Sequence, residues 1–223
     1  MTERPALTPQ LGRTRVMAIL RSADASGLLA VATALASGGV TCLEVTLTTA
    51  GALDVLAAIR AELGPDVAVG AGTVITGDQA RDALAAGAEF LVAPVVDTAV
   101  VRNAADRGVP CYPGAWTPTE VSQAWQAGAA AVKLFPASTG GPAHLRQLRA
   151  PLPGIPLVAV GGVGLDEARD YLDAGACAVG IGSPLVRGAD QDPTAQALDA
   201  LTARARTLLD AVRTTARARE ASA

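Results

Sequence analysis

Short apolar runs alternate with longer amphipathic segments along nearly the whole chain. Eight runs rich in Val, Ile, Leu and Ala have the length of buried β-strands. They are residues 15–20, 42–47, 67–72, 89–94, 109–114, 130–135, 155–162 and 176–182. Eight segments with helical periodicity follow them in turn, at roughly 24–37, 49–63, 77–86, 97–107, 117–127, 141–150, 165–174 and 193–216. Strands and helices that alternate through short links favour a parallel sheet.

Glycine recurs at intervals of 20 to 26 residues, near the end of each helical segment. Glycine just past the last helical turn commonly adopts the left-handed conformation. The predicted caps are Gly38, Gly64, Gly87, Gly108, Gly128, Gly154 and Gly175. Eight strand–helix units predict a single (β/α)₈ TIM barrel over residues 1–223, with frayed ends at about 1–10 and 214–223. A doubly wound open sheet is the alternative, but the first strand is not followed by its GxGxxG turn.

Composition and charge exclude several function classes. Net charge is −3 and the arginines are scattered, so we expect no nucleic-acid partner. No apolar run approaches the length of a membrane span, and the first ten residues lack a signal core, so we expect a cytoplasmic protein without a membrane partner. Cys42, Cys111 and Cys177 form no CxxC motif and are expected to be free thiols. With His144 as the single histidine, we expect no metal.

Among the eighteen lysine and arginine residues, only Lys133 is a lysine, and it lies inside an apolar predicted strand. If Val132 and Leu134 face the helices, strand alternation turns Lys133 into the barrel interior. The same rule turns Glu44 inward. Arginine would hold a structural ion pair at least as well, but it cannot lose its proton and become a nucleophile. We therefore favour a Schiff-base lysine over a buried Lys–Glu salt bridge, because burial favours the uncharged amine.

Two glycine-rich loops follow the seventh and eighth predicted strands. The segments "GGVG" at 161–164 and "GIGSP" at 180–184 leave backbone N–H groups unobstructed, and Ser183 adds a hydroxyl. Barrels frequently bind phosphate with the loops after these two strands. Either loop alone is equally well explained as a tight turn. Their pairing at the last two strands predicts a phosphate site.

The ordered set of motifs resembles that of the class I aldolases acting on 2-keto-3-deoxy-6-phosphogluconate and 4-hydroxy-2-oxoglutarate. The resemblance covers about residues 10–215 and is carried by "LEVTL", "GAGT", "PG" with "TPTE", "VKLFPAS" followed by "GGP", "GGV" and "GIGS". It implies a (β/α)₈ barrel, commonly a homotrimer, without metal or organic cofactor. It also implies cleavage of a small phosphosugar keto acid to pyruvate and an aldehyde, D-glyceraldehyde 3-phosphate or glyoxylate, in Entner–Doudoroff-type carbohydrate metabolism.

The same resemblance implies a role for each matching residue. Lys133 would form the Schiff base with the substrate, and Glu44 would be the general acid–base. Thr73 would contact the pyruvate carboxylate. The pocket walls and the phosphate site would come from Pro94, Phe135, Gly161, Gly162, Gly182 and Ser183.

Two positions depart from the family pattern. Some members carry arginine where this chain has Thr48, and Arg21 at the end of the first strand is the expected substitute. Both Thr48 and Arg21 are expected to bind substrate. Residues 159–162 are "AVGG" where phosphogluconate-type members have "PTGG", so Val160 replaces a hydroxyl near C4 of the substrate. Galactonate-type sister enzymes share "AVGG", which makes a 2-keto-3-deoxy-6-phosphogalactonate aldolase the first alternative. A phosphosugar isomerase or epimerase, and a non-catalytic metabolite-binding barrel, remain open.

Overall fold

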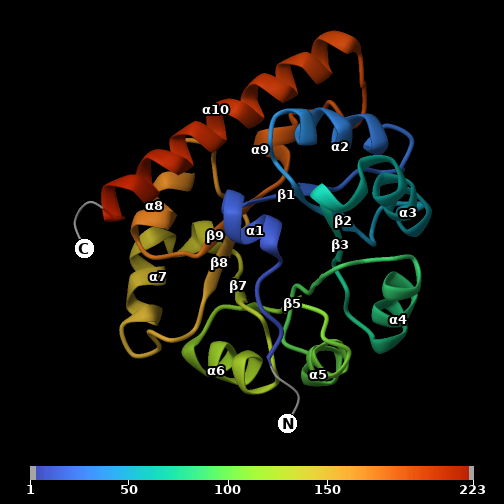
Figure 1. Ribbon diagram of the computed structural model, residues 1–223. Coiled ribbons are helices and arrows are strands. Elements are labelled where there is room, and N and C mark those ends of the chain that lie inside the picture. The colour runs from blue at the N-terminus through green and yellow to red at the C-terminus, as the bar shows by residue number, and fades with distance from the viewer. Residues whose placement is uncertain (1–3, 221–223) are drawn as a thin grey trace.

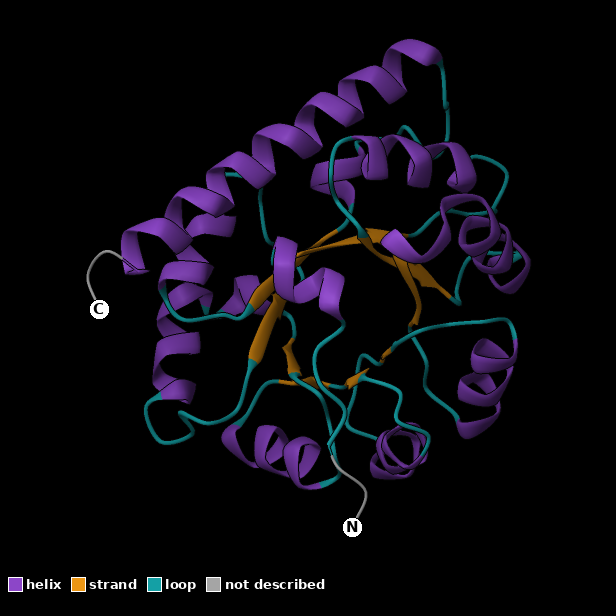
Figure 2. Cartoon of the chain, viewed as in Figure 1, coloured by secondary structure: helices purple, strands orange, loops and turns teal. Residues whose placement is uncertain are grey.

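The computed structural model describes residues 4–220 as a ring of parallel strands surrounded by helices (Figure 1). The strands are β1 (Val16–Leu20), β2 (Cys42–Thr46), β3 (Ala68–Gly72), β4 (Leu91–Val92), β5 (Cys111–Tyr112), β6 (Gly114–Ala115), β7 (Val132–Leu134), β8 (Leu157–Val160) and β9 (Ala178–Ile181). Figure 2 shows them as an inner ring with the helices outside. The predicted (β/α)₈ barrel is confirmed.

The fifth predicted strand is divided at Pro113 into β5 and β6. These two segments end the sheet order β5-β4-β3-β2-β1-β9-β8-β7-β6, so the chain through Pro113 joins the two ends and closes the ring. Proline has no backbone N–H to donate to a neighbouring strand. Its carbonyl still accepts a hydrogen bond from the backbone N–H of Lys133 at 2.9 Å. The eight predicted strands therefore appear as nine.

Helices connect and cover the strands. They are α1 (Pro9–Thr14), α2 (Leu28–Ser37), α3 (Ala52–Leu63), α4 (Gly77–Ala85), α5 (Thr98–Asp106), α6 (Pro118–Gln126), α7 (Gly141–Arg149), α8 (Ala168–Asp173), α9 (Ser183–Val186) and α10 (Ala195–Glu220), with 3₁₀ turns η1 (Gly64–Asp66) and η2 (Ala137–Thr139). Helix α2 begins later than predicted because the Asp24 carboxylate accepts hydrogen bonds from Ser26 in a turn. None of the helices within residues 4–220 has both the length and the apolar character to cross a bilayer.

Helix α1 was not predicted, and it lies across the N-terminal opening of the barrel, against β1, β2 and β9 (Figure 1). Its Leu11 is fully buried in the inner apolar cluster. The Thr8 hydroxyl before it lies 2.6 Å from the Tyr112 hydroxyl, also buried. Residues near the N-terminus that we expected to fray are therefore packed here, and α10 continues to Glu220. The remaining expected frayed positions, 1–3 and 221–223, lie outside the described residues.

Apolar side chains form two clusters, one on each side of the sheet. Leu43, Val45, Val132 and Leu134 belong to the outer cluster, between the strands and the helices. The inner cluster fills the lumen with side chains such as that of Phe90. This alternation confirms the predicted strand register. It leaves the intervening Glu44 and Lys133 on the inner side.

Five of the seven predicted cap glycines have positive φ: Gly64, Gly87, Gly108, Gly128 and Gly175. The prediction is wrong for Gly38 and Gly154. Gly38 has a φ of −81°, and Gly39 takes the left-handed conformation. A Cβ at Gly38 would lie 2.5 Å from Cβ of Ala205 in α10, so the close approach of that helix requires the glycine.

Candidate active site

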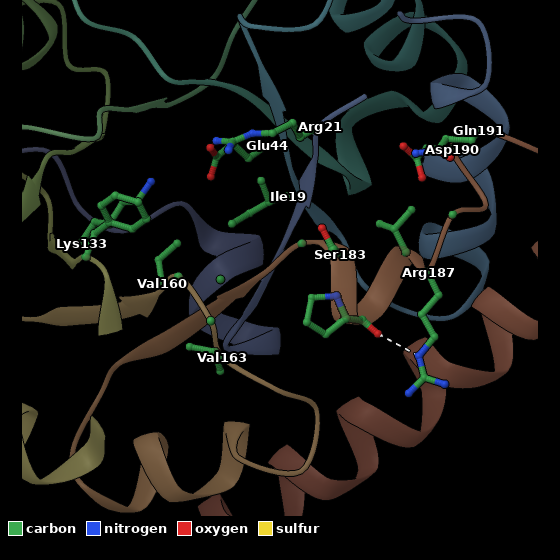
Figure 3. Close-up of a pocket in the computed structure, with 18 residues that line it drawn as sticks. Ile19, Arg21, Glu44, Lys133, Val160, Val163, Ser183, Arg187, Asp190 and Gln191 are labelled. Atoms are coloured by element: carbon green, nitrogen blue, oxygen red, sulfur yellow. Dashed lines mark hydrogen bonds between the residues drawn. The ribbon is translucent and has the colours of Figure 1, made fainter. Parts of the chain in front are cut away.

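A cavity of about 500 Å³ lies at the carboxyl ends of strands β1, β2, β7, β8 and β9 (Figure 3). This is the end at which barrel enzymes carry their functional groups. The cavity brings together nine of the predicted site residues. They are Arg21, Glu44, Lys133, Phe135, Val160, Gly161, Gly162, Gly182 and Ser183.

Lys133 and Glu44 enter this cavity from opposite sides of the barrel. Lys133 lies on β7 and Glu44 on β2, and strands β1, β9 and β8 separate them along the sheet. Only 5% of Lys133 and 1% of Glu44 is exposed. The Lys133 amine lies 4.8 Å from the centroid of the Phe135 ring, within reach of a cation–π contact when it is protonated. The amine and the carboxylate thus face one confined, partly apolar space.

Burial shifts both groups toward their uncharged forms. Desolvation lowers the pKa of the Lys133 amine; Glu44 opposes this shift, and Arg21 adds to it. Desolvation raises the pKa of the Glu44 carboxyl, against the opposing effects of Lys133 and Arg21. A lysine with a lowered pKa has more of the neutral amine that can attack a carbonyl. The site therefore suits nucleophilic lysine chemistry beside a group able to hold a proton.

The Glu44 carboxylate has no hydrogen bond or ion pair to any residue within the described range, and its Oε2 atom is fully buried. Nearby, Nη2 of Arg21 donates to Oγ1 of Thr73 at 3.4 Å. Thr73 itself has a φ of 61°. A β-branched residue rarely adopts this conformation, and backbone strain of this kind gathers at functional sites. The end of β3 therefore holds a constrained hydroxyl against a guanidinium beside the cavity.

The two predicted glycine loops form the wall next to Lys133. Gly161 and Gly162 have φ values of 93° and 72°, which only glycine adopts easily. A Cβ at Gly161 would also lie 2.8 Å from the Phe135 ring. Gly182 precedes the short helix α9, and Ser183 is its exposed first residue. Backbone groups and a hydroxyl are thus available to an anion on this side.

Three predicted residues do not line the cavity: Thr48, Thr73 and Pro94. Thr48 is exposed in the turn after β2, where its hydroxyl lies 3.1 Å from that of Thr46. Thr73 accepts a hydrogen bond from Arg21, which does line the cavity. Pro94 is half-buried, and its carbonyl packs against Gly114 of β6. Whether Thr48 contacts a substrate therefore stays a prediction.

Three further lining residues, Val163, Gly180 and Pro184, belong to the two predicted glycine-rich loops. The lining residues that were not predicted lie mostly in the segment after β9, and they are Ile19, Val186, Arg187, Gly188, Asp190 and Gln191. Nε of Arg187 donates to the Pro184 carbonyl at 3.2 Å, the dashed line in Figure 3. Asp190 and Gln191 lie at the far side of the cavity from Lys133 in that view. These residues form no motif. The only sequence feature that could have predicted them is their position after the last barrel strand.

Metal-ligating side chains do not gather at this site. Over residues 4–220, no three His, Cys, Asp or Glu side chains lie close enough together to hold a metal ion. Cys42 and Cys111 are buried free thiols, and Cys177 is a partly buried one.

Comparison with known proteins identifies the family. A family model described as KDPG and KHG aldolase matches residues 8–214. A 2-dehydro-3-deoxy-phosphogluconate aldolase of Treponema pallidum is 39% identical over 73% of this chain and 77% of its own length. A 2-dehydro-3-deoxy-6-phosphogalactonate aldolase of Escherichia coli K12 is 37% identical over 81% of this chain and 89% of its own length.

A solved structure also superposes on this barrel. It is a KDPG aldolase of Legionella pneumophila with pyruvate captured at low pH as a covalent carbinolamine intermediate. Its TM-score is 0.80 at 27% identity, over 89% of this chain and 96% of that one. Taken with the lysine and glutamate in the cavity, these matches show that the chain belongs to the KDPG and KHG aldolase family and is a carbon–carbon lyase.

Proposed function

We propose that this enzyme cleaves 2-keto-3-deoxy-6-phosphogluconate-type keto acids through a Schiff base on Lys133, without metal or organic cofactor. The observation that carries the proposal is a buried lysine, with its pKa lowered by desolvation, facing a buried glutamate in the cavity. The covalent pyruvate described for the Legionella pneumophila relative supports the same chemistry. The family match supports the substrate class.

The reaction begins when the neutral Lys133 amine adds to the C2 ketone of the substrate. The carbinolamine hydroxyl takes a proton from the Glu44 carboxylic acid and leaves as water, which gives a protonated imine. This imine carries positive charge next to C3 and accepts the electron pair of the bond that breaks next. The Glu44 carboxyl suits this exchange, because desolvation raises its pKa and makes the proton-carrying form more accessible.

Cleavage follows from the imine. Glu44, now a carboxylate, removes the proton of the C4 hydroxyl, and the C3–C4 bond breaks to release an aldehyde. The electron pair of that bond moves into the imine and forms an enamine. Glu44 returns its proton to C3, which restores the protonated imine. Water then hydrolyses this imine to pyruvate and the free Lys133 amine, and the proton released in this step returns to Glu44. One carboxyl group therefore serves every proton transfer.

The ends of the substrate have candidate partners. Arg21 supplies a guanidinium near Lys133 and takes the place of the family arginine that is Thr48 here, so we assign it to the keto-acid carboxylate. Thr73, bonded to Arg21 at 3.4 Å, supports the same end. The phosphate would bind the backbone around Gly161 and Gly162, with Gly182 and the Ser183 hydroxyl opposite.

Val160 favours a second candidate substrate, the galactonate epimer. Its side chain lines the cavity and offers no hydrogen bond to a C4 substituent. A direct test is to measure pyruvate release from both phosphorylated epimers and from 4-hydroxy-2-oxoglutarate. A preference for the galactonate epimer would assign the chain to the sister activity while leaving the lysine mechanism intact.

The mechanism is tested by trapping. Pyruvate with sodium borohydride should add the mass of a reduced pyruvyl group to Lys133, located by peptide mass spectrometry. Lys133→Ala should lose both the adduct and turnover. Lys133→Arg keeps the positive charge and therefore tests whether charge alone, without a nucleophilic amine, supports turnover. Absence of the adduct in the wild-type protein would overturn the proposal and favour a phosphosugar isomerase. Pyruvate binding without turnover would favour a non-catalytic barrel.

The assembly and the compartment belong to the same proposal. The family resemblance favours a homotrimer, and the exposed side chains of Ile75 and Val95, at 49% and 52%, supply an apolar surface for contact between copies. These loops are neighbours, since Val74 donates to the Val92 carbonyl at 3.1 Å. Free thiols favour action in the cytoplasm.

A further inference from the structure

The Glu44 carboxylate lacks the hydrogen bonds that usually orient a catalytic carboxyl group. None reaches it from any residue of the described chain, and no cation lies within ion-pair distance there. A general acid–base nevertheless has to be held within about 0.5 Å of its working position. The charges of Lys133 and Arg21 act on this carboxylate without a direct bond, so close positioning also requires the shape of its surroundings.

Gly72, on the neighbouring strand β3, supplies that shape. Strands β2 and β3 pair in parallel, with Glu44 opposite Gly70 and Thr46 opposite Gly72. A Cβ built on Gly72 would overlap Oε1 of Glu44 and lie 2.5 Å from both its Cδ and its Cγ. Carbon atoms in good contact lie about 3.5–4.0 Å apart. The glutamate side chain thus occupies the space that any residue other than glycine would fill.

The backbone gives no other reason for glycine at this position. Gly72 lies in a regular strand and is not among the glycines with positive φ. Glycine inside a strand weakens it and often marks close approach of another group. An alanine could therefore adopt the backbone conformation of Gly72, and only its methyl group would conflict with Glu44.

We propose that Gly72 is a positioning residue for Glu44, an inference that rests on the proton-transfer role proposed above. The missing side chain leaves a recess that holds the carboxylate by van der Waals contact, in addition to the attraction of Lys133 and Arg21. Because no neighbour binds the carboxylate oxygens, they stay free to exchange protons with the substrate. A methyl group at position 72 displaces the carboxylate, and a displacement of about 1 Å can cost about 10²-fold in rate.

The kinetics of a Gly72→Ala variant test whether Gly72 positions Glu44 for proton transfer. We expect kcat for cleavage to fall about 10- to 100-fold with little change in KM. Exchange of the pyruvate methyl protons with solvent, which needs Glu44 but no aldehyde, should slow by a similar factor. Borohydride should still attach pyruvate to Lys133. Gly77→Ala is the matched control, because nothing lies within 4 Å of its added Cβ, and it should leave all three measurements unchanged.

A stability cycle tests the contact independently of activity. We expect Gly72→Ala to lower the unfolding temperature by about 3–10 °C in the wild-type background. In a Glu44→Ala background the same change should cost almost nothing, because the overlapping carboxylate is gone. This second arm remains informative if Gly72→Ala alone fails to fold.

Two results would overturn the inference. One is a stability loss from Gly72→Ala that is the same with and without Glu44. The other is a folded Gly72→Ala enzyme with wild-type kcat and methyl exchange. If the wild-type protein itself neither traps pyruvate nor exchanges its methyl protons, the proposed function fails instead, and the stability cycle still decides whether Gly72 positions Glu44.

Discussion

Lys133 and Arg21 are two basic residues of one cavity, and they differ in how readily each loses its proton. The amine is buried and its pKa is lowered, whereas arginine stays protonated under all ordinary conditions. A permanent charge suits a carboxylate-binding residue, and a removable proton suits a nucleophile. The arginine also helps the lysine, because its charge disfavours a second cation nearby.

Replacing Arg21 should therefore change the pH dependence as well as the affinity. In Arg21→Met the pKa of Lys133 rises, so less neutral amine is present at a given pH. We expect the acid limb of kcat/KM to move to higher pH and KM for the keto acid to rise. A pH–rate profile measures the first effect; a profile that stays in place would show that Arg21 acts on the substrate alone.

Glu44→Gln should have two separable effects. Loss of the proton carrier should slow cleavage by about 10²–10⁴-fold. Because Glu44 raises the pKa of Lys133, its removal should also move the acid limb to lower pH, opposite to Arg21→Met. Steady-state assays across pH measure both. Unchanged turnover would mean that another group carries the protons.

The placement of Lys133 and Glu44 in one cavity could be predicted from the sequence, because strand alternation and residue type point to the same side chains. Asp190 and Gln191 show where this reasoning does not reach. Thr48, a candidate because of its place in a motif, lies exposed in the turn after β2 beside Thr46, and its role stays a prediction. Asp190 and Gln191 follow no periodicity, and only the folded loop brings them to the cavity.

Among the elements, the strands were more predictable than the helix ends. Each buried strand is a distinct apolar run, and eight such runs specify the barrel. Helix α1 has six residues with a proline at its start, too few to show a helical period. Gly38 was mistaken for a cap because its real constraint is α10, more than 150 residues later in the chain. Such long-range contacts leave no local pattern.

Helix α1 should matter for stability but not for chemistry. Its Leu11 is fully buried in the lumen, at the opposite end from the carboxyl ends of the strands. Leu11→Ala should lower the free energy of unfolding by about 2–5 kcal/mol. Urea denaturation measures this loss, and kcat of the folded variant should stay within about twofold of wild type. A large fall in kcat would show that helix α1 also shapes the active site.

At the scale of the whole molecule, the exposed apolar side chains mark a surface for assembly. Ile75 and Val95 follow β3 and β4, close to the loops that carry Thr73 and Pro94. If these loops meet a second copy in a trimer, Ile75→Glu should place charge in a buried contact and yield a smaller particle. Light scattering with size-exclusion chromatography measures the mass. A trimer unaffected by this change would place the interface elsewhere.

The closed lower end of the barrel has a kinetic consequence. Leu11 and its neighbours fill the lumen below Lys133, so within the described chain every ligand enters and leaves above the carboxyl ends of the strands. In the proposed mechanism, the aldehyde departs while the three-carbon fragment is still bonded to Lys133. Release is then ordered, and added pyruvate should inhibit competitively against the substrate, whereas added aldehyde should inhibit noncompetitively. Initial-rate measurements with each product distinguish this sequence from random departure.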